Sequence, residues 1–286
     1  MSFVPLFTQH SRSWRDNRYV YPVISRRSKG LSIGVNLNPD KVCNFDCIYC
    51  CVDRTTPPTI REVDLEVLKD ELSHMLELFK SGELFKQAPF DTTPEHLRRL
   101  NDIAFSGDGE PTSYPRFQEA CEISASLLQR AGHSETKMVV ITNATLFHQP
   151  RVQRALEFLD HHNGEIWAKL DAGTEEYYRL VERTSIPLKR VLDNILLAGT
   201  VRPIVIQSLF MKVHDQAPSE SEIDEFVRRL IELREQGCQI KLVQVYTIAR
   251  DTAEAYVAPL ERERVDAIAA KVRASGLNVE AYYGPT

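Results

Sequence analysis

Three cysteines lie close enough in the chain for their side chains to share one metal centre. Cys43, Cys47 and Cys50 fall within eight residues of one another, in the stretch GVNLNPDKVCNFDCIYCCVD at residues 34–53. Thiolates are the usual ligands of iron–sulfur clusters, and a [4Fe–4S] cluster normally takes four of them. A loop that supplies three leaves one iron open to another ligand. The spacing therefore predicts a [4Fe–4S] cluster with one iron not bound by protein.

A structural zinc site and a set of incidental thiols are the two alternatives. Zinc sites use two separated cysteine pairs or a cysteine and histidine quartet, and no fourth ligand at such a spacing is evident. Disulfides are disfavoured because MSFVPLFTQHSRSW is not a secretory signal and the cysteines form no framework. We interpret Cys51, Cys121 and Cys238 as small packed side chains.

The three-cysteine spacing, with Tyr49 directly before the last cysteine, resembles the radical S-adenosylmethionine (SAM) superfamily. The resemblance implies that Cys43, Cys47 and Cys50 hold a [4Fe–4S] cluster whose open iron binds SAM. An electron then cleaves SAM to methionine and a 5′-deoxyadenosyl radical, which abstracts hydrogen from a substrate. The resemblance also implies that Tyr49 packs beside the adenine and that a reductant such as flavodoxin or ferredoxin supplies the electron.

A glycine-rich turn, SGDGEPT, follows a short predicted strand and contains Gly107, Asp108, Gly109 and Glu110. Glycines let backbone groups approach a ligand closely, and a glutamate can accept a hydrogen bond from an ammonium group. Taken alone, the segment is equally a plain acidic turn. It resembles the superfamily motif that holds the amino group of SAM, with the motif's second glycine at Asp108 or Gly109.

Further polar residues stand at the ends of later predicted strands. Lys169 and Asp171 are two residues apart, so their side chains share one face of a strand. Because burying either charge alone is costly, we expect them to pair or to contact a ligand. The resemblance implies that Asn143, Lys169 and Asp171 contact the ribose and carboxylate of SAM, with Ser208 as a further contact. A purely structural ion pair is the alternative.

Arg250 follows the last predicted core strand, in the segment VYTIARDTAEAYVAPL. Its guanidinium can bind an anionic group of a substrate through two parallel hydrogen bonds. Pairing with Asp251 or Glu254 on the surface is equally compatible with the sequence.

Apolar periodicity predicts strands that alternate with helices. Parallel strands joined by right-handed crossovers follow from this alternation, and six core strands suit an open barrel. The predicted fold class is α/β, a partial (β/α)6 barrel of the radical SAM type. We expect an N-terminal extension at 1–30, the barrel at 31–255, and a C-terminal helix and short strand at 256–286. Six core strands are predicted: one at 31–39, a second that ends just before the turn at 106, and four at 137–142, 164–172, 203–211 and 240–246. Helices are predicted at 64–82, 114–131, 149–159, 174–198 with a break at Pro187, 219–236 and 261–275.

Composition limits the classes of protein. The chain has 286 residues, 43% of them hydrophobic, and a formal net charge of −5. This length suits one larger domain, and the negative charge argues weakly against a surface devoted to nucleic acid. No apolar run approaches the roughly 20 residues that a membrane span needs. We therefore expect a cytoplasmic protein that is not bound to a membrane.

The N-terminal basic stretch and the motifs leave several functions open. Residues 12–29 mix arginines with aromatic side chains, which suits either RNA contacts or a solvated strand that covers one end of a barrel. The motifs NLNPDKVCNFDCIYC, GDGEPT and VYTIARDTAE resemble a superfamily branch related to wyosine-base synthesis on tRNA. Wyosine-forming enzymes take a second cluster from cysteines before this motif, and residues 1–42 contain none. The substrate is thus a small molecule, a protein or tRNA. Besides hydrogen abstraction from an unidentified substrate, the alternatives are a glycyl-radical-enzyme activase, a tRNA-base-modifying enzyme, and a non-enzymatic RNA-binding or electron-transfer iron–sulfur protein.

Overall fold

The computed structural model describes residues 6, 12 and 14–284. Contacts within the chain divide it into two compact units. The first unit contains the described residues up to Cys43, together with Thr56–Ile141 and Pro150–Glu165. The second contains Asn44–Thr55, Thr142–Gln149 and the residues from Ile166 onward. The predicted division into an extension, a barrel and a C-terminal segment stays a prediction, and residues 1–5, 7–11, 13 and 285–286 lie outside the described part.

Strands of the first unit follow one another in the order of the chain. Strands β1 and β2 form an antiparallel hairpin. Strand β3 is parallel to β2, and β4 is parallel to β3. Helix α1 packs on α2, and α2 packs on α3. The bounds are β1 Val20–Ser25, β2 Gly30–Val35, β3 Leu100–Phe105, β4 Lys137–Thr142, α1 Leu65–Lys80, α2 Phe117–Ala131 and α3 Pro150–Asp160.

Strand β1 corrects one interpretation of the basic N-terminal stretch. Residues 20–24 are buried, so this segment is not a solvated strand. A strand with one face in solvent would show alternating burial, but both faces of β1 are covered. The basic residues Arg26, Arg27 and Lys29 instead occupy the turn between β1 and β2.

Helix α1 begins and ends as its sequence predicts. The carboxylate of Asp64 accepts hydrogen bonds from the backbone N–H groups of Glu66 (3.0 Å) and Val67 (3.3 Å), which a helix start leaves without partners. Its buried side chains recur at helical spacing. The segment after it is partly buried through Leu84 and Phe90. It forms three short 3₁₀ helices at Glu83–Lys86, Phe90–Thr92 and Glu95–Leu97.

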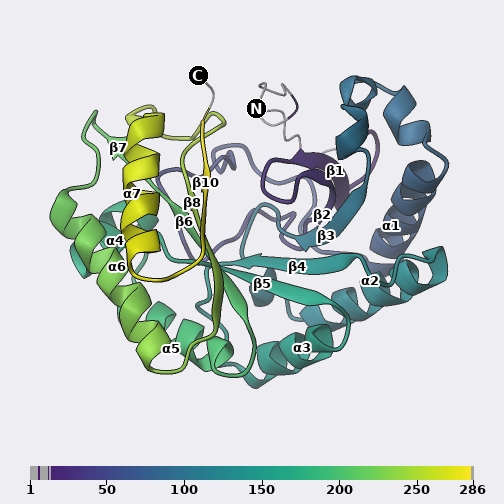
Figure 1. Cartoon of the computed structure of the whole chain (residues 1–286). Coiled ribbons are helices and arrows are strands. Elements are labelled where there is room, and N and C mark those ends of the chain that lie inside the picture. The colour runs from purple at the N-terminus through teal and green to yellow at the C-terminus, as the bar shows by residue number, and fades with distance from the viewer. Residues whose placement is uncertain (1–5, 7–11, 13, 285–286) are drawn as a thin grey trace. The chain divides into compact units, whose positions relative to one another are not determined.

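Parallel strands joined by helices make up most of the second unit. Strand β5 pairs with β6, β6 with β8, and β8 with β10, all parallel. Figure 1 shows α7, in yellow, beside β8 and β10, with which it is in contact. Pro187 caps α5 and separates it from α4, at the predicted break. The bounds are β5 Gly164–Lys169, β6 Ile204–Leu209, β8 Ile240–Tyr246, β10 Val279–Tyr282, α4 Glu175–Glu182, α5 Leu188–Gly199, α6 Glu220–Glu235 and α7 Arg262–Ala274.

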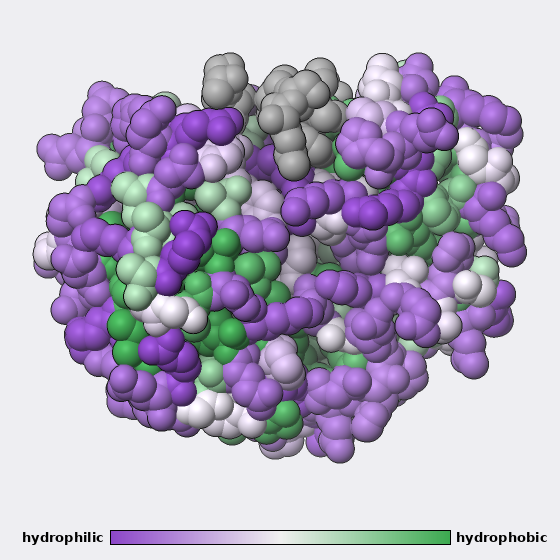
Figure 2. Space-filling model, viewed as in Figure 1, coloured by the Kyte–Doolittle hydropathy of each residue, from purple (hydrophilic) through white to green (hydrophobic). Residues whose placement is uncertain are grey.

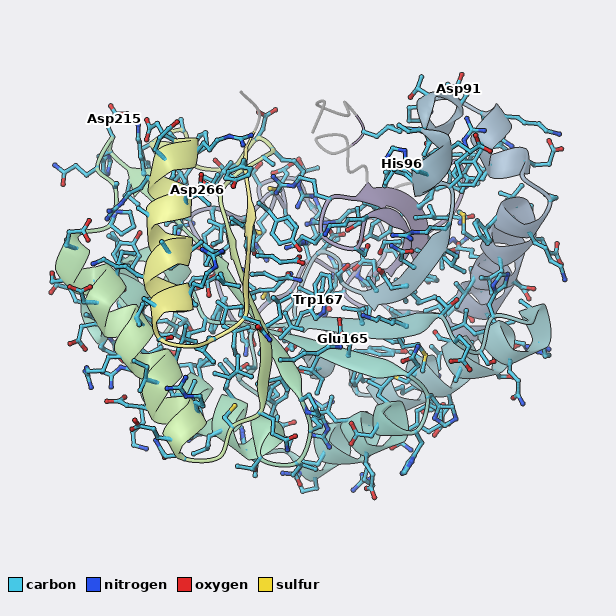
Figure 3. The ribbon with its side chains drawn as sticks, in the orientation of Figure 1. Asp91, His96, Glu165, Trp167, Asp215 and Asp266 are labelled. Carbon is cyan, nitrogen blue, oxygen red and sulfur yellow. The ribbon has the colours of Figure 1, made fainter. Side chains whose placement is uncertain are left out.

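A small two-stranded sheet was not predicted from the sequence. Strands β7 (Met211–Val213) and β9 (Val257–Pro259) pair antiparallel. A tight turn follows β7, where His214 and Asp215 adopt positive φ angles of 48° and 62°. Asp215 is labelled in Figure 3, at the tip of this turn. Each strand is only three residues long, too short for a pattern of alternation to be recognised.

Each of the six predicted core strands is present, as β2, β3, β4, β5, β6 and β8, and the predicted terminal strand is β10. The alternation of strands and helices confirms the α/β class. In the second unit an apolar core includes Ile48, Leu209, Met211 and Ile248. Figure 2 shows that hydrophilic residues cover most of the visible face and that apolar residues show beside α7. Within the described residues, no helix combines the length and apolar character that crossing a membrane requires.

Candidate functional site

Residues 43–50 are called the cysteine loop here, and from Asn44 onward they are held within the second unit by the end of helix α4. The backbone N–H of Asp46 donates to the carbonyl of Glu182 (3.1 Å), and that of Ile48 donates to the carbonyl of Val181 (2.9 Å). The last carbonyls of a helix have no partners within the helix. The cysteine loop supplies those partners, so the helix end and the loop fix each other.

Arg183 and Thr184, which follow α4, make further contacts with the cysteine loop. Arg183 ends the helix in the left-handed conformation (φ 45°), and its Nε donates to the carbonyl of Asp46 (2.6 Å). Its guanidinium also pairs with the carboxylates of Asp46 (3.1 Å) and Glu254. The hydroxyl of Thr184 donates to the carbonyl of Asn44 (3.0 Å). Four consecutive residues, 181–184, thus fix the backbone of residues 44–48.

Asn143 reaches the same loop from the end of β4. Its Nδ2 donates to Oδ1 of Asn44 (2.6 Å), and Nδ2 of Asn44 donates to the hydroxyl of Thr145 (2.7 Å). The Oδ1 of Asn143 in turn accepts from the Thr145 hydroxyl (2.7 Å). The structure therefore brings Asn143 to the residue that follows Cys43 in the chain.

A buried polar network connects the loop with the end of β5. The Tyr49 hydroxyl donates to Oδ2 of Asp171 (2.5 Å), and the same carboxylate oxygen pairs with Nζ of Lys169 (3.0 Å). The other oxygen of Asp171 accepts from the backbone N–H of Leu209 (2.7 Å). Lys169 also donates to the Tyr246 hydroxyl (3.0 Å) and lies over the Tyr49 ring, 4.8 Å from its centre. The expected pairing of Lys169 with Asp171 is present, and Tyr49 shares in it.

Glu182, which was not among the predicted site residues, contacts both Cys47 and Tyr49. Its carboxylate accepts from the Cys47 thiol (2.7 Å) and from the Tyr49 hydroxyl (3.1 Å), and its side chain is buried. Burial, reinforced by Asp171, raises the pKa of Glu182 well above its ordinary value. Burial and then the Glu182 carboxylate likewise raise the pKa of Cys47.

The same balance of burial and charge acts on the two groups beside Asp171. Burial, reinforced by Asp171, raises the pKa of the Tyr49 hydroxyl. Burial would lower the pKa of Lys169, but Asp171 and the neighbouring anionic groups outweigh it and raise that pKa. At neutral pH this region therefore holds a protonated lysine and an un-ionised tyrosine.

The spacing of apolar residues on α4 is the sequence signal that could have identified Glu182. On α4 the buried residues are Tyr178, Val181 and Glu182, spaced by three and four positions. This spacing places Glu182 on the core side of the helix. A carboxylate on the core side of a helix needs a buried partner, which would have marked it as a candidate.

Ser208 and its neighbour Gln207 lie on opposite faces of β6. Gln207 is in register with Lys169 on β5 and with Gln244 on β8, and its Nε2 donates to Oε1 of Gln244 (2.8 Å). Because side chains alternate along a strand, Gln207 shares the face of Lys169 and Ser208 faces the other way. Both side chains are fully buried. The polar neighbour of Lys169 on this strand is therefore Gln207.

The glycine-rich turn belongs to the first unit, where it packs closely on the segment after β2. A Cβ atom on Gly107 would lie 2.2 Å from Oδ1 of Asn36, and one on Gly109 would lie 2.1 Å from the carbonyl of Val42. The Asn36 side chain accepts from the backbone N–H of Asp108 (3.1 Å) and donates to its carboxylate (2.7 Å). These two positions leave no room for a side chain, which explains their glycines.

Asp108 and Glu110 both have protein partners within the first unit. Asp108 also forms an ion pair with Arg12 (2.8 Å). The buried carboxylate of Glu110 accepts from the backbone N–H (3.1 Å) and the hydroxyl (2.5 Å) of Thr112, capping the 3₁₀ helix Pro111–Ser113. Glu110 thus has a structural role as the cap of this turn.

None of the six cysteines forms a disulfide. Cys121 and Cys238 are buried, as predicted, but Cys51 is exposed, so its interpretation as a packed side chain is wrong. In a loop without regular alternation Val52 fills the buried position instead. Arg250 lies at a cavity that Asp251 and Glu254 also line.

Cysteine side chains match the ligand type of an iron–sulfur cluster. Cys43, the first residue of the cysteine loop, belongs to the first unit. Cys47 and Cys50 belong to the second. Among residues 6, 12 and 14–284, no three His, Cys, Asp or Glu side chains are arranged as the ligands of a metal ion. The ligand chemistry nevertheless fits, because thiolates are the ligands that these clusters take and no disulfide occupies the three cysteines.

Comparisons with known proteins identify the family. The model of the radical SAM superfamily matches residues 37–217. Among curated relatives, a UPF0026 protein of Helicobacter pylori is 28% identical over 216 residues, 73% of this chain and 61% of that protein. A UPF0026 protein of Methanocaldococcus jannaschii is 29% identical over 180 residues, 61% of this chain and 46% of that protein. The chain thus spans about three fifths or less of the length of these relatives.

Solved structures show the same fold at low sequence identity. A radical SAM methyltransferase from Sphaerobacter thermophilus has a TM-score of 0.64 at 14% identity, over 92% of this chain and 69% of that chain. TYW1 with a lysine–pyruvate adduct has a TM-score of 0.52 at 16% identity, over 86% of this chain and 74% of that chain. These likenesses concern the fold alone. With the family match, they confirm the predicted fold class, a partial (β/α)6 barrel of the radical SAM type.

Proposed function

Because the chain belongs to the radical SAM superfamily, we propose that it is a radical SAM enzyme with one [4Fe–4S] cluster, held by Cys43, Cys47 and Cys50. The cluster, when bound, supplies the electron that cleaves SAM to methionine and a 5′-deoxyadenosyl radical, which abstracts hydrogen from the substrate. The proposal rests on three cysteines within eight residues, none of them in a disulfide, in a loop that α4 and Asn143 hold in place.

Residues of the second unit bind and orient SAM in this proposal. Lys169 is the cation at the end of β5 that suits the SAM carboxylate, and Asp171 keeps it in place through the ion pair at 3.0 Å. Tyr49, whose hydroxyl is tied to Asp171, offers its ring to the adenine. Asn143 orients the cysteine loop, and Ser208, which was expected as a further contact, is left out because it faces away from Lys169.

Backbone groups of the first unit bind the amino group of SAM in this proposal. Gly107, Asp108, Gly109 and Glu110 form the turn, whose glycines permit a close approach of the backbone. The partners of Asp108 and Glu110 within the unit give this turn a fixed shape. A fixed turn binds a ligand with a smaller loss of conformational entropy than a flexible one.

The substrate stays open, because the likeness to a methyltransferase and to TYW1 reaches only the fold. We propose that the chain is an oxidoreductase whose partner is a reductant such as flavodoxin or ferredoxin. The cytoplasm is the proposed location, because reduced thiols persist there.

Anaerobic reconstitution of the full chain tests the proposal. We expect about four irons per chain, the content of a [4Fe–4S] cluster. Dithionite and SAM should then yield 5′-deoxyadenosine, detected by mass spectrometry. Cys47→Ala should abolish both iron binding and product.

Cys51→Ala is the matched control, because Cys51 is exposed and adjacent to Cys50. This variant should keep the iron content and the 5′-deoxyadenosine of the wild type. A reconstituted wild type that takes up zinc but no iron would refute the proposal. So would a Cys47→Ala variant that still forms 5′-deoxyadenosine.

A further inference from the structure

Helix α6 binds the turn that joins β5 to α4, within the second unit. Residues 172–174, called the β5–α4 turn here, follow Asp171 directly and end where α4 begins. The turn therefore lies between two parts of the candidate site. Before it is the network of Asp171 with Lys169 and Tyr49, and after it is α4, whose end holds the cysteine loop.

Glu222 on α6 accepts hydrogen bonds from three donors of this turn. Its side chain is buried, and its Oε1 accepts from the backbone N–H groups of Gly173 (2.5 Å) and Thr174 (3.4 Å). Its Oε2 accepts from the Thr174 hydroxyl (2.5 Å). That hydroxyl oxygen itself accepts from the backbone N–H of Tyr177 (3.2 Å) and so caps the start of α4. One carboxylate thus holds both the turn and the residue that caps the helix.

Two further residues of α6 contact the turn from the same face of the helix, because Phe226 and Arg229 are four and seven positions after Glu222. The Nε of Arg229 donates to the carbonyl of Gly173 (3.1 Å), so α6 binds both backbone polar groups of this glycine. A Cβ atom on Gly173 would lie 2.1 Å from the backbone nitrogen of Phe226. We call Glu222, Phe226 and Arg229 the α6 clamp.

A displacement of the β5–α4 turn would reach both parts of the site. Helix α4 has eight residues, about 12 Å at 1.5 Å per residue, and a helix this short moves as one rigid body. The carboxylate of Glu182, its last residue, accepts from the Cys47 thiol (2.7 Å). In the other direction, Asp171 is only two residues before Gly173. The turn thus links the position of Asp171 to that of Cys47.

We propose that Glu222 is a positioning residue for the candidate site, which acts through the β5–α4 turn. It determines where α4 presents Glu182 to Cys47 and where Asp171 holds Lys169. That these positions serve the binding of SAM rests on the proposed function, whereas the contacts of the α6 clamp do not.

Alkylation of Cys47 by iodoacetamide in the native full-length apoprotein, followed by mass spectrometry, tests the inference without a cofactor. Glu222→Leu removes the acceptor of the turn. Glu222→Gln keeps an oxygen for the two N–H groups, and its NH₂ group can donate to the Thr174 hydroxyl oxygen. We expect Glu222→Leu to raise the alkylation rate of Cys47 about tenfold or more, the factor that one lost hydrogen bond to a charged group corresponds to. Glu222→Gln should react as the wild type does.

Val272→Ala on α7 is the matched control for a general loss of stability, because Val272 is fully buried and its truncation leaves a cavity. It should leave the Cys47 rate unchanged. Circular dichroism and urea denaturation establish which variants are folded under the conditions of alkylation. Arg229→Met, a milder change in the α6 clamp, should also raise the rate, and it decides the test if Glu222→Leu does not fold. The inference is overturned if the folded clamp variants react at the wild-type rate, if Val272→Ala raises the rate equally, or if Glu222→Gln behaves as Glu222→Leu does.

Binding of S-adenosylhomocysteine after anaerobic reconstitution separates this inference from the proposed function. If both hold, Glu222→Leu binds S-adenosylhomocysteine more weakly than the wild type, and Glu222→Gln binds it equally well. A wild type that neither binds it nor forms 5′-deoxyadenosine, with a Cys47 rate that still depends on Glu222, refutes the proposed function alone. Cleavage of SAM by the wild type, with a Cys47 rate that is independent of Glu222, refutes this inference alone.

Discussion

Replacing Asp171 by alanine should destabilise the chain more than any exposed aspartate replacement. The Asp171 side chain is fully buried, and one of its oxygens is shared by the Lys169 ammonium group and the Tyr49 hydroxyl. The other oxygen accepts from the backbone N–H of Leu209. Asp171→Ala therefore leaves a largely buried cation without this partner and a buried N–H group without an acceptor.

The size of the effect follows from these contacts. Removing one partner of a buried ion pair costs about 3–5 kcal/mol. At roughly 2–4 °C per kcal/mol for a chain of this size, the melting temperature should fall by roughly 6–20 °C. Asp171→Asn keeps an acceptor for Leu209 and loses only the charge, so it should cost about 1.5–3 kcal/mol.

Urea denaturation of the apoprotein, followed by circular dichroism, measures the effect without any cofactor. Asp193→Ala is the matched control, since Asp193 is exposed and pairs with Lys189 one helical turn away. Such surface pairs contribute about 0.3–0.5 kcal/mol. Equal losses of stability for Asp171→Ala and Asp193→Ala would refute the view that the buried network holds this region together.

Three other predictions concern a thiol, a glycine and a carboxylate. Burial raises the pKa of Cys238 to about 11, so at pH 8 iodoacetamide should modify it far more slowly than the exposed Cys51, as mass spectrometry of the native protein would show; equal rates would contradict this. Gly109→Ala should lower the free energy of unfolding by about 1–3 kcal/mol in urea denaturation, because its Cβ would lie 2.1 Å from the carbonyl of Val42. Gly132→Asn should lower it less, because Gly132 ends a helix in the left-handed conformation, which asparagine tolerates. The reverse order would be inconsistent with the structure. Burial raises the pKa of Asp102, so its neutral form favours folding below the unfolded-state pKa, and this contribution is lost as pH rises through the folded-state pKa. The wild type should therefore lose stability relative to Asp102→Asn between pH 3 and pH 7, and a difference in urea midpoint that is independent of pH would argue against it.

The sequence was sufficient where a local pattern determines the structure. Helix α1 follows from its apolar spacing and from Asp64, whose carboxylate caps it. The break between α4 and α5 follows from Pro187, which cannot continue a helix. The pairing of Lys169 with Asp171 follows from a spacing of two on a buried strand. In each case neighbouring residues carry the physical cause.

Long-range contacts were not predictable in the same way. The spacing on α4 indicates that Glu182 lies on the core side of the helix, but only the fold brings it to Cys47. Strands β7 and β9 are too short to show a pattern, and each depends on the other for its hydrogen bonds. That Gln207 rather than Ser208 shares the face of Lys169 depends on the register between β5 and β6, which no single strand reveals.

The contacts of residues 181–184 with the cysteine loop have a consequence for biosynthesis. Cys47 leaves the ribosome 135 residues ahead of Glu182, so the nascent loop emerges without the helix end that shapes it. At about 5–20 residues per second, translation takes roughly 7–27 s to supply that partner. Throughout this interval the cysteine loop lacks this partner, so in the proposed enzyme we expect the cluster to be loaded after α4 has been synthesised.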